Sequence, residues 1–419
     1  MTHSKRGVKA AFAIGLVAAT FIGLSGCAAS DSTTGDATTG DIRILANITP
    51  VLTKEYYEGL VQPFIDSHPG VTVTIESPSG KDVQSTLQQE LASGSTPDIV
   101  ASSLDKVVAP QMTEFPDEQW VKDTPLVETN TVDGKVWQVA TGVQIKSLVY
   151  YNKTAFEDAG ITEIPKSLDE YTDALAKLQA AGYIGLETAG EWVTSAQFGM
   201  MADPGVLGDN FNWYQDRNDK KVTFADSPWA TYLDAYAGWI ASGAIPQDSL
   251  GKKYDDSITE FLSGTVGTYI MANWFVASAD AATDLPFDIG VFPVPTIDGS
   301  IPKQEGGTAQ PFSILKASKN QALAMELVKY LVSDKTAVET SLKSEGNFRA
   351  GFSYPGSDLN TAVADLLDAA PGTFNGTAPG LNPAFGNQLN VVVQSLYTGT
   401  SAKDAAAGLD TWWDANANQ

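Results

Sequence analysis

Short segments of the chain alternate apolar and polar residues at every second position, which is the pattern of β-strands. The first is DIRILANIT, in which Ile42, Ile44 and Ala46 fall on one side. Segments with a similar strand-like character are VTVTIES, PDIVAS, YIGLET, GTYIMAN, FDIGVFPVP and PFSILKAS. Two more extended segments are expected at Val136–Ala140 and Ser147–Asn152. We predict a strand at each of these places.

Other segments place an apolar residue every three or four positions, which predicts helices. The segment VQSTLQQELAS shows this spacing and ends directly before Gly94. Ser167 and Glu170 form a capping box before another helix, and Pro228 lies in the first turn of a third. Further helices are expected at Lys54–Ser67 and Gln321–Val332. Because strands and helices alternate over residues 41–102, the pattern predicts an α/β fold with a largely parallel sheet.

The first 26 residues have the pattern of an export signal. Three basic residues precede an apolar run, Ala10–Leu24. That run is shorter than the ~20 residues that a membrane-spanning helix needs, and it suits the apolar part of a signal peptide. It leads into LSGC, where Cys27 is the single cysteine of the chain. LSGC resembles a lipobox, in which the cysteine is lipidated and residues 1–26 are removed. The alternative is an ordinary secretory signal with a chance cysteine.

Composition divides the rest of the chain into a tether and a body. After Cys27, residues 28–40 are small or polar, and such a segment buries too little apolar surface to offset its ordering entropy. Residues 27–40 are therefore expected to form a flexible tether. The remaining body of about 380 residues exceeds the usual ~100–200 residues of one domain, so two domains are expected.

Charge and missing motifs exclude several classes of function. The net charge is −24, which disfavours nucleic-acid binding because phosphates need a basic face. After signal removal His68 is the one histidine left, and no G-x-S-x-G, C-x-x-C, H-E-x-x-H or G-x-G-x-x-G pattern occurs. We therefore expect no catalytic triad, metal site or cofactor. Glu187 and Glu191 keep glycoside hydrolysis open as an acid pair, although a solvated loop explains them equally well.

Aromatic residues give a positive indication of function. The chain has nine Trp and fourteen Tyr, and several rings lie outside the helical stripes. Trp192 in AGEWV, Trp274 in MANWF and Phe385 in NPAFGNQ are flanked by small residues and by amide or acid groups. A flat apolar ring beside directional polar groups suits a sugar, which has an apolar face and a polar rim. The alternative for each ring is a place in the core.

Five segments in order resemble a known family. They are ASGSTPDIVASS, the stretch from GKVWQVATG to SLDEYTDAL, FLSGTVGTYIMANWF, FDIGVFPVP and SILKASKNQALAMELVKYLVSD. Together they resemble the extracellular solute-binding proteins of carbohydrate importers. The resemblance implies an α/β, two-lobed, periplasmic-binding-protein-like fold with a hinge and a ligand cleft between the lobes. It places residues 41–141 plus 291–344 in the N-terminal lobe and residues 142–290 plus 345–419 in the C-terminal lobe.

The resemblance also implies which residues contact ligand. It implies hydrogen-bonding and stacking contacts from Ser79, Lys81, Ser102, Ser103, Gln144, Glu191, Trp192, Trp274, Phe385, Asn387 and Gln388. Of these, Gln144 stands where relatives often have a carboxylate, which leaves the identity of the sugar open. Ser79 and Lys81 come from the loop after the second expected strand.

The function implied by the resemblance is capture without chemistry. The chain is expected to be a monomeric lipoprotein, anchored through Cys27 at the outer face of the cytoplasmic membrane. It would bind an oligosaccharide and deliver it to the permease of an ABC importer. Two alternatives stay open, namely a binder of the same fold for a peptide or polyamine, and a surface glycosidase that uses Glu187 and Glu191.

Overall fold

The computed structural model describes residues 39–80, 82–104 and 106–416. The expected signal at 1–26, the expected lipidation site Cys27, nearly all of the tether and the candidate ligand residue Lys81 lie outside these ranges. Within the described ranges, no helix is both long enough and apolar enough to cross a membrane.

The first of two larger sheets follows the order β12-β11-β3-β1-β2, and β6 also pairs with β11. Its strands are β1 (Gly40–Ala46), β2 (Val71–Glu76), β3 (Ile99–Ala101), β6 (Val139–Ile145), β11 (Gln304–Ile314) and β12 (Thr373–Asn375). β1 runs parallel to β2 and β3, whereas β11 runs antiparallel to β3 and β6. The expected parallel layer is thus confirmed for β1, β2 and β3, and later strands complete a mixed sheet.

The second sheet follows the order β10-β7-β9-β8. Its strands are β7 (Leu148–Asn152), β8 (Ile184–Glu187), β9 (Val266–Met271) and β10 (Ile289–Pro293). β8 is parallel to β9, and the other two pairs are antiparallel. A short hairpin of β4 (Thr131–Val132) and β5 (Lys135–Val136) stands apart from both sheets.

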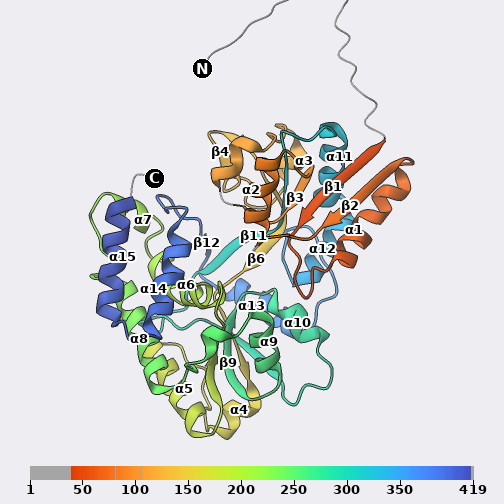
Figure 1. Cartoon of the computed structure of the whole chain (residues 1–419). Helices are drawn as coiled ribbons and strands as arrows, with labels where there is room; N and C mark the ends of the chain where they lie inside the picture. The colour runs from red at the N-terminus through yellow and green to blue at the C-terminus, as the bar shows by residue number, and fades with distance from the viewer. Residues whose placement is uncertain (1–38, 81, 105, 417–419) are drawn as a thin grey trace, which may run out of the picture. The chain divides into compact units, whose positions relative to one another are not determined.

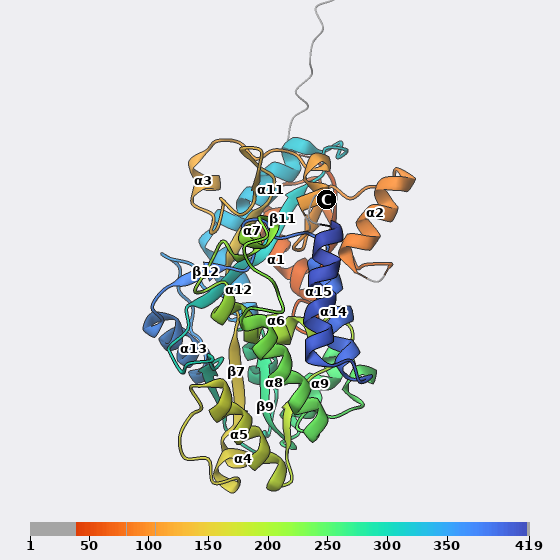
Figure 2. The ribbon, with the colours of Figure 1, turned by 90° about the vertical axis from the view of Figure 1, so that its left-hand side faces the viewer.

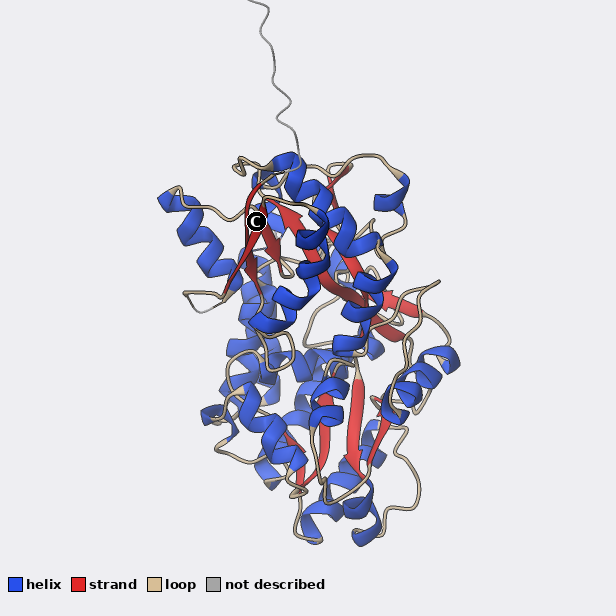
Figure 3. Ribbon diagram, turned by 90° about the vertical axis from the view of Figure 1, so that its right-hand side faces the viewer, coloured by secondary structure: helices blue, strands red, loops and turns tan. Residues whose placement is uncertain are grey.

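Helices surround both sheets (Figure 3). Those between residues 54 and 242 are α1 (Lys54–Ser67), α2 (Val83–Ser93), α3 (Gln119–Lys122), α4 (Lys153–Asp158), α5 (Leu168–Ala180), α6 (Val193–Val206), α7 (Trp213–Asn218) and α8 (Pro228–Ser242). The later ones are α9 (Tyr254–Leu262), α10 (Phe275–Ala281), α11 (Gln321–Ser333), α12 (Lys335–Glu345), α13 (Asp358–Ala369), α14 (Phe385–Leu396) and α15 (Ala402–Asn416). Two 3₁₀ turns cover Lys106–Gln111 and Ser249–Gly251. Figure 1 shows where these elements lie.

Local signals in the sequence were good guides to helix ends. The Ser167 hydroxyl accepts from the Glu170 backbone N–H at 3.2 Å, and the Glu170 carboxylate accepts from the Ser167 N–H at 3.1 Å, which confirms the capping box. α2 ends at Gly94 and α8 at Gly243, and both glycines take the left-handed conformation that favours glycine.

Two strand predictions needed correction. The strand expected at Val136–Ala140 is wrong, because the chain ends β5 at Val136 and begins β6 at Val139. The strand expected at PFSILKAS begins much earlier, at Gln304. Its first half, QEGGTAQ, has no apolar alternation, and its extended form depends on pairing with β6 from Gly306 to Phe312.

The buried apolar residues form separate cores around the two sheets. One face of the first sheet carries Ile42, Ile44 and Ala46, as the alternation predicts, and Leu45 belongs to a smaller cluster on the other face. The core around the second sheet draws on residues 145–294 and again on residues 363–413. The chain therefore leaves and re-enters each core.

One predicted lobe boundary falls in the wrong place. The division between residues 290 and 291 cuts β10, which pairs over all its five residues with β7. Phe292 and Val294 lie in the core around the second sheet. We therefore move this boundary beyond Val294, and the other boundaries remain our proposal.

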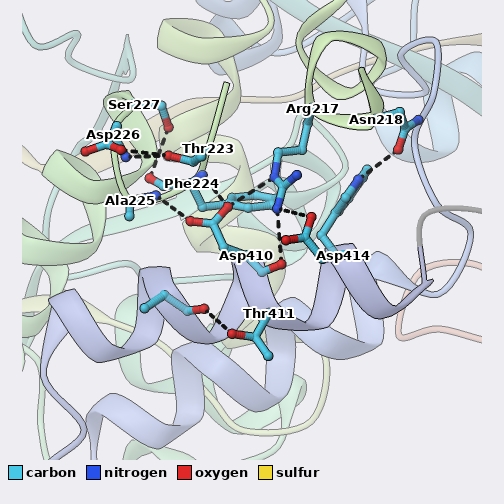
Figure 4. Close-up of polar contacts among 12 residues, drawn as sticks. Arg217, Asn218, Thr223, Phe224, Ala225, Asp226, Ser227, Asp410, Thr411 and Asp414 are labelled. Carbon is cyan, nitrogen blue, oxygen red and sulfur yellow. Dashed lines mark hydrogen bonds and ion pairs between the residues drawn. The ribbon is translucent and has the colours of Figure 1, made fainter. Parts of the chain in front are cut away.

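The C-terminal helices pack on the core around the second sheet, and α15 pairs with the buried side chain of Arg217. α14 and α15 lie side by side, with α8 next to α15 (Figure 2). The Arg217 side chain on α7 is 3 % exposed, and its guanidinium pairs with Asp410 at 3.1 Å and Asp414 at 2.9 Å, both on α15. Figure 4 shows Arg217 directed at these two carboxylates. A segment that is distant in sequence thereby becomes part of this core.

Candidate ligand-binding site

Ser103 and Gln144, two of the predicted ligand residues, line one pocket of about 320 Å³. Ser103 follows β3, and Gln144 lies on β6 opposite Gly307 of β11. Because glycine has no side chain, the polar end of Gln144 is left uncovered on that side. The wall is completed by residues that sequence reasoning missed, among them Asn130, Trp137, Gln138, Lys146, Asn375 and Thr377.

Two hydrogen-bond donors on this wall lack a partner. The indole nitrogen of Trp137 and the side-chain amide nitrogen of Asn130 are buried, and neither bonds to any acceptor in the described part of the chain. A buried polar group without a partner costs free energy, and such groups in native proteins call for an explanation. A bound ligand with acceptor oxygens would satisfy both donors.

One of the residues that line the pocket, Lys146, belongs to an ion pair. The Lys146 ammonium lies 2.9 Å from the Glu305 carboxylate, which is almost fully buried. The attraction of that carboxylate raises the pKa of Lys146, so the lysine stays charged. Glu305 offsets the charge of Lys146, and the exposed Lys106 adds a second cationic side chain to the wall of the pocket.

Trp192 and Trp274, two of the three predicted rings, are joined by a residue that sequence reasoning missed. Trp192 precedes α6, Trp274 precedes α10, and Tyr254 is the first residue of α9. The Trp192 and Tyr254 ring centroids are 5.0 Å apart. Burial raises the pKa of Tyr254, and the nearby Trp274 side chain opposes that rise. Trp192 remains 43 % exposed. We call Trp192, Tyr254 and Trp274 the aromatic face.

Phe385 is not part of the aromatic face, which corrects the expectation that this ring contacts ligand. It is 3 % exposed and packs within 6 Å of Tyr214, Phe224, Trp229 and Trp413. The segment NPAFGNQ begins α14 instead of forming a loop, and the first turn points Phe385 inward. A core ring offers no surface to a ligand, so we leave Phe385 out of the proposed site.

Replacing Phe385 by leucine should therefore change stability and not binding. A leucine fills most of the space but loses ring contacts, so we expect a loss of about 1–1.5 kcal/mol in unfolding free energy. Chemical denaturation measures this loss, and calorimetry measures ligand affinity. A tenfold loss of affinity with unchanged stability would contradict the placement of Phe385.

The remaining predicted residues are spread over both parts of the fold. Ser102 is half-buried, and its carbonyl accepts from Gln138 at 3.0 Å. Ser79 is exposed after β2, Asn387 is exposed on α14, and Gln388 is half-buried beside it. None of these three lines the pocket that contains Ser103 and Gln144.

Glu187 and Glu191 differ sharply in environment. Glu187 ends β8, is fully buried and lies 2.8 Å from the Lys252 ammonium. Glu191 is exposed and takes a left-handed backbone conformation, and its carbonyl accepts from the side chains of Asn390 and Gln394 on α14. An acid with no solvent exposure cannot reach a glycosidic bond, which argues against the two as a hydrolytic pair.

Burial raises the pKa of Glu187 to about 7, and the hydrogen bond from Lys252 opposes that rise. Besides Lys252, the charged or titratable groups that act on it are Glu260 and Asp248, and it in turn acts on Tyr269 and Tyr397. A folded-state pKa above the ordinary glutamate value of 4.5 means that the folded protein binds more protons than the unfolded chain between pH 4.5 and 7.

We therefore expect Glu187 to make the protein more stable as pH falls from 8 towards 5. Its contribution is lost as pH rises through 7, with a slope below about 1.4 kcal/mol per pH unit for one proton. Denaturation of the native protein and of Glu187→Gln across this range isolates the effect. The prediction is contradicted if the native protein becomes more stable relative to Glu187→Gln as the pH rises.

In the described part of the chain, no group of three or more His, Cys, Asp or Glu side chains could hold a metal ion. The pocket is lined by hydroxyl, amide, aromatic and aliphatic side chains together with Lys106 and Lys146, of which Lys146 is paired with Glu305. Such groups bind by hydrogen bonding and stacking.

The profile of the bacterial extracellular solute-binding protein family matches residues 49–338. The match covers more than half of the chain, which belongs to this family. A diacetylchitobiose binding protein of Streptomyces coelicolor is 26 % identical over 296 residues, which are 65 % of this chain and 64 % of that relative.

Solved structures with a similar fold include three sugar binders. A chitin oligosaccharide binding protein superposes with a TM-score of 0.79 at 19 % identity, over 91 % of this chain and all of that one. The raffinose complex of RafE gives 0.75 at 16 % identity, over 90 % and 100 %. A manno-oligosaccharide binder from Bifidobacterium animalis subsp. lactis, in complex with mannotriose, gives 0.73 at 20 % identity, over 92 % and 96 %. These matches confirm the α/β, two-lobed, periplasmic-binding-protein-like fold.

Proposed function

We propose that this chain is the ligand-capturing protein of an ABC importer and that its ligand is an oligosaccharide. It binds the sugar between its two lobes and delivers it to the permease in the membrane. It is a monomer at the outer face of the cytoplasmic membrane, held there by a lipid on Cys27. It performs no reaction on the sugar.

The observation that carries the proposal is the aromatic face. Trp192 and Tyr254 are in ring contact, Trp274 lies near the Tyr254 hydroxyl, and Trp192 keeps 43 % of its surface in solvent. Sugars stack their apolar C–H faces on exposed rings of this kind. Ser103, Gln144, Asn130 and Trp137 supply polar groups in the pocket between β3 and β6.

Known relatives point in the same direction. The sequence relative is named for diacetylchitobiose, and the similar structures are named for chitin oligosaccharide, raffinose and manno-oligosaccharide. These names describe those proteins, and they agree in the class of ligand while differing in the sugar. Micromolar binding corresponds to about −8 kcal/mol, which a few stacked rings and buried hydrogen bonds can supply after the ordering costs.

Titration calorimetry of the protein with a panel of neutral oligosaccharides tests the proposal. We expect micromolar or tighter binding of at least one of diacetylchitobiose, raffinose and mannotriose or a related sugar. Binding of spermidine or of short peptides but of no sugar would establish the alternative, a same-fold binder of a non-sugar solute. Release of reducing sugar from a polysaccharide would establish the glycosidase instead.

A further inference from the structure

The aromatic face is assembled from loops that are separate in the sequence. Trp192 belongs to the loop between β8 and α6, and Tyr254 opens α9 directly after the loop that follows α8. Their ring centroids are 5.0 Å apart with an interplanar angle of 48°. The shape of the face therefore depends on how the β8–α6 loop is held against residues 249–253.

Those two loops touch through their backbones. The Gly190 N–H donates to the Lys252 carbonyl at 3.0 Å. A Cβ atom at Gly190 would collide with the Leu250 carbonyl oxygen, so the approach requires glycine at this position. Trp192 lies two residues beyond Gly190, and Tyr254 lies two residues beyond Lys252. The backbone contact therefore joins the two loops just before each ring in the sequence.

A buried ion pair joins the same loops. Glu187, at the end of β8, has no exposed side-chain surface, and its Oε1 lies 2.8 Å from the Lys252 Nζ. The Glu260 carboxylate lies farther from the same ammonium, at 3.8 Å. On the other side, the Gln197 side-chain amide donates to the Glu187 carbonyl at 3.0 Å, which ties the pair to α6.

Neither residue of the pair can itself contact a ligand in this structure. Glu187 is fully buried, and 19 % of the Lys252 side chain is exposed, with its ammonium turned to the two carboxylates. Buried charges are costly unless they are paired, so a buried pair between the two loops that carry Trp192 and Tyr254 calls for a reason. The second Glu187 oxygen has no partner among the described residues, which leaves Lys252 as its main anchor.

We propose that Glu187 and Lys252 are positioning residues for ligand binding: their ion pair fixes Trp192 against Tyr254 and thereby sets the affinity for a stacked sugar ring. This inference rests on the proposed function, because it assigns a role within the same site. It goes further in predicting that affinity is controlled by two residues that the ligand never touches.

The test breaks the pair and follows both the rings and the ligand. Lys252→Met keeps the length of the side chain and removes its charge. Acrylamide quenching reports on Trp192 when the signal of each protein is compared with that of its own Trp192→Phe derivative. Calorimetry with diacetylchitobiose and with raffinose reports affinity. We expect Lys252→Met to raise Trp192 quenching at least twofold and to weaken sugar binding about tenfold.

Two further variants make the result decisive. Glu187→Gln keeps the shape of the acid and one acceptor oxygen, so we expect smaller changes in Trp192 quenching and affinity, in the same direction. This variant replaces Lys252→Met in the test if Lys252→Met does not fold. Asp410→Ala weakens the Arg217 network in the same lobe; among the described residues, the hydrogen bonds of the Asp410 carboxylate go to Arg217, Phe224 and Ala225, which lie in neither loop. It should lower stability while leaving Trp192 quenching and affinity unchanged.

Each outcome has one meaning. Trp192 quenching in Lys252→Met that equals the native value would overturn the positioning role, whether or not any sugar binds. Equal losses of affinity in Lys252→Met and Asp410→Ala would also overturn it, because general destabilisation would then explain both. If the native protein binds no sugar in the panel, the proposed function fails, and the quenching comparison still decides whether the pair positions Trp192.

Discussion

Replacing Trp274 by alanine is expected to weaken oligosaccharide binding by tenfold to a hundredfold, which is about 1.4–2.8 kcal/mol. The change removes a flat ring that is half-buried in the free protein. It also removes the side chain that lies near the Tyr254 hydroxyl, so the neighbouring ring loses a contact. Large aromatic residues typically dominate binding energy, because they bury much area at little entropic cost. Calorimetry with the best sugar of the panel measures the change.

A matched tryptophan elsewhere provides the control. Trp412 on α15 is also half-buried, but it packs towards Phe385 and Trp413 and not towards the aromatic face. Trp412→Ala should therefore cost stability and leave affinity unchanged. If Trp274→Ala bound the sugar as tightly as the native protein does, Trp274 would have to be removed from the site, and the aromatic face would no longer support the proposed function.

Replacing Asp410 by alanine is expected to destabilise the protein by about 3 kcal/mol. Its carboxylate accepts from the Arg217 side chain at 3.1 Å and from the backbone N–H groups of Phe224 and Ala225 at 2.8 and 3.0 Å (Figure 4). The variant leaves the buried guanidinium with one carboxylate and leaves two backbone donors without their acceptor. Urea denaturation with linear extrapolation measures the loss.

Asp414, the second carboxylate that pairs with Arg217, shows how much an exposed ion pair contributes to stability. Asp414 also pairs with Arg217, at 2.9 Å, but its side chain is 55 % exposed. Ion pairs of exposed groups contribute little, so Asp414→Ala should cost less than about 1 kcal/mol. Similar losses in Asp410→Ala and Asp414→Ala would show that charge alone, and not the bonds to the backbone N–H groups of Phe224 and Ala225, stabilises the packing of α15.

Several features of the fold were accessible from the sequence because their causes are local. The capping box at Ser167 and Glu170 and the glycine after α2 work through groups a few residues apart. The alternation of Ile42, Ile44 and Ala46 likewise follows from the strand period, whatever the partner strands are. The first half of β11 could not be found in this way, because its extended form comes from β6.

The candidate site was predictable in part for the same reason. Trp192 and Trp274 follow strands and stand among small residues; Trp192 is 43 % exposed, whereas Trp274 is half-buried against the core. Phe385 has the same kind of neighbours, yet it is buried by rings from α7, α8 and α15, which no local pattern reveals. Nothing in the sequence around Tyr254 marks it as a ligand residue, and we include it only because it lies beside Trp192 and Trp274.

By itself, the sequence determined the α/β class, the ends of several helices and the family resemblance. The tertiary structure decided which rings meet, where β10 belongs, and that Gln144 faces a glycine beside Ser103 in one pocket. The physical reason is the distance along the sequence over which each interaction acts. Helix caps and periodicity involve a few neighbouring residues, whereas burial and ring contacts involve segments that only folding brings together.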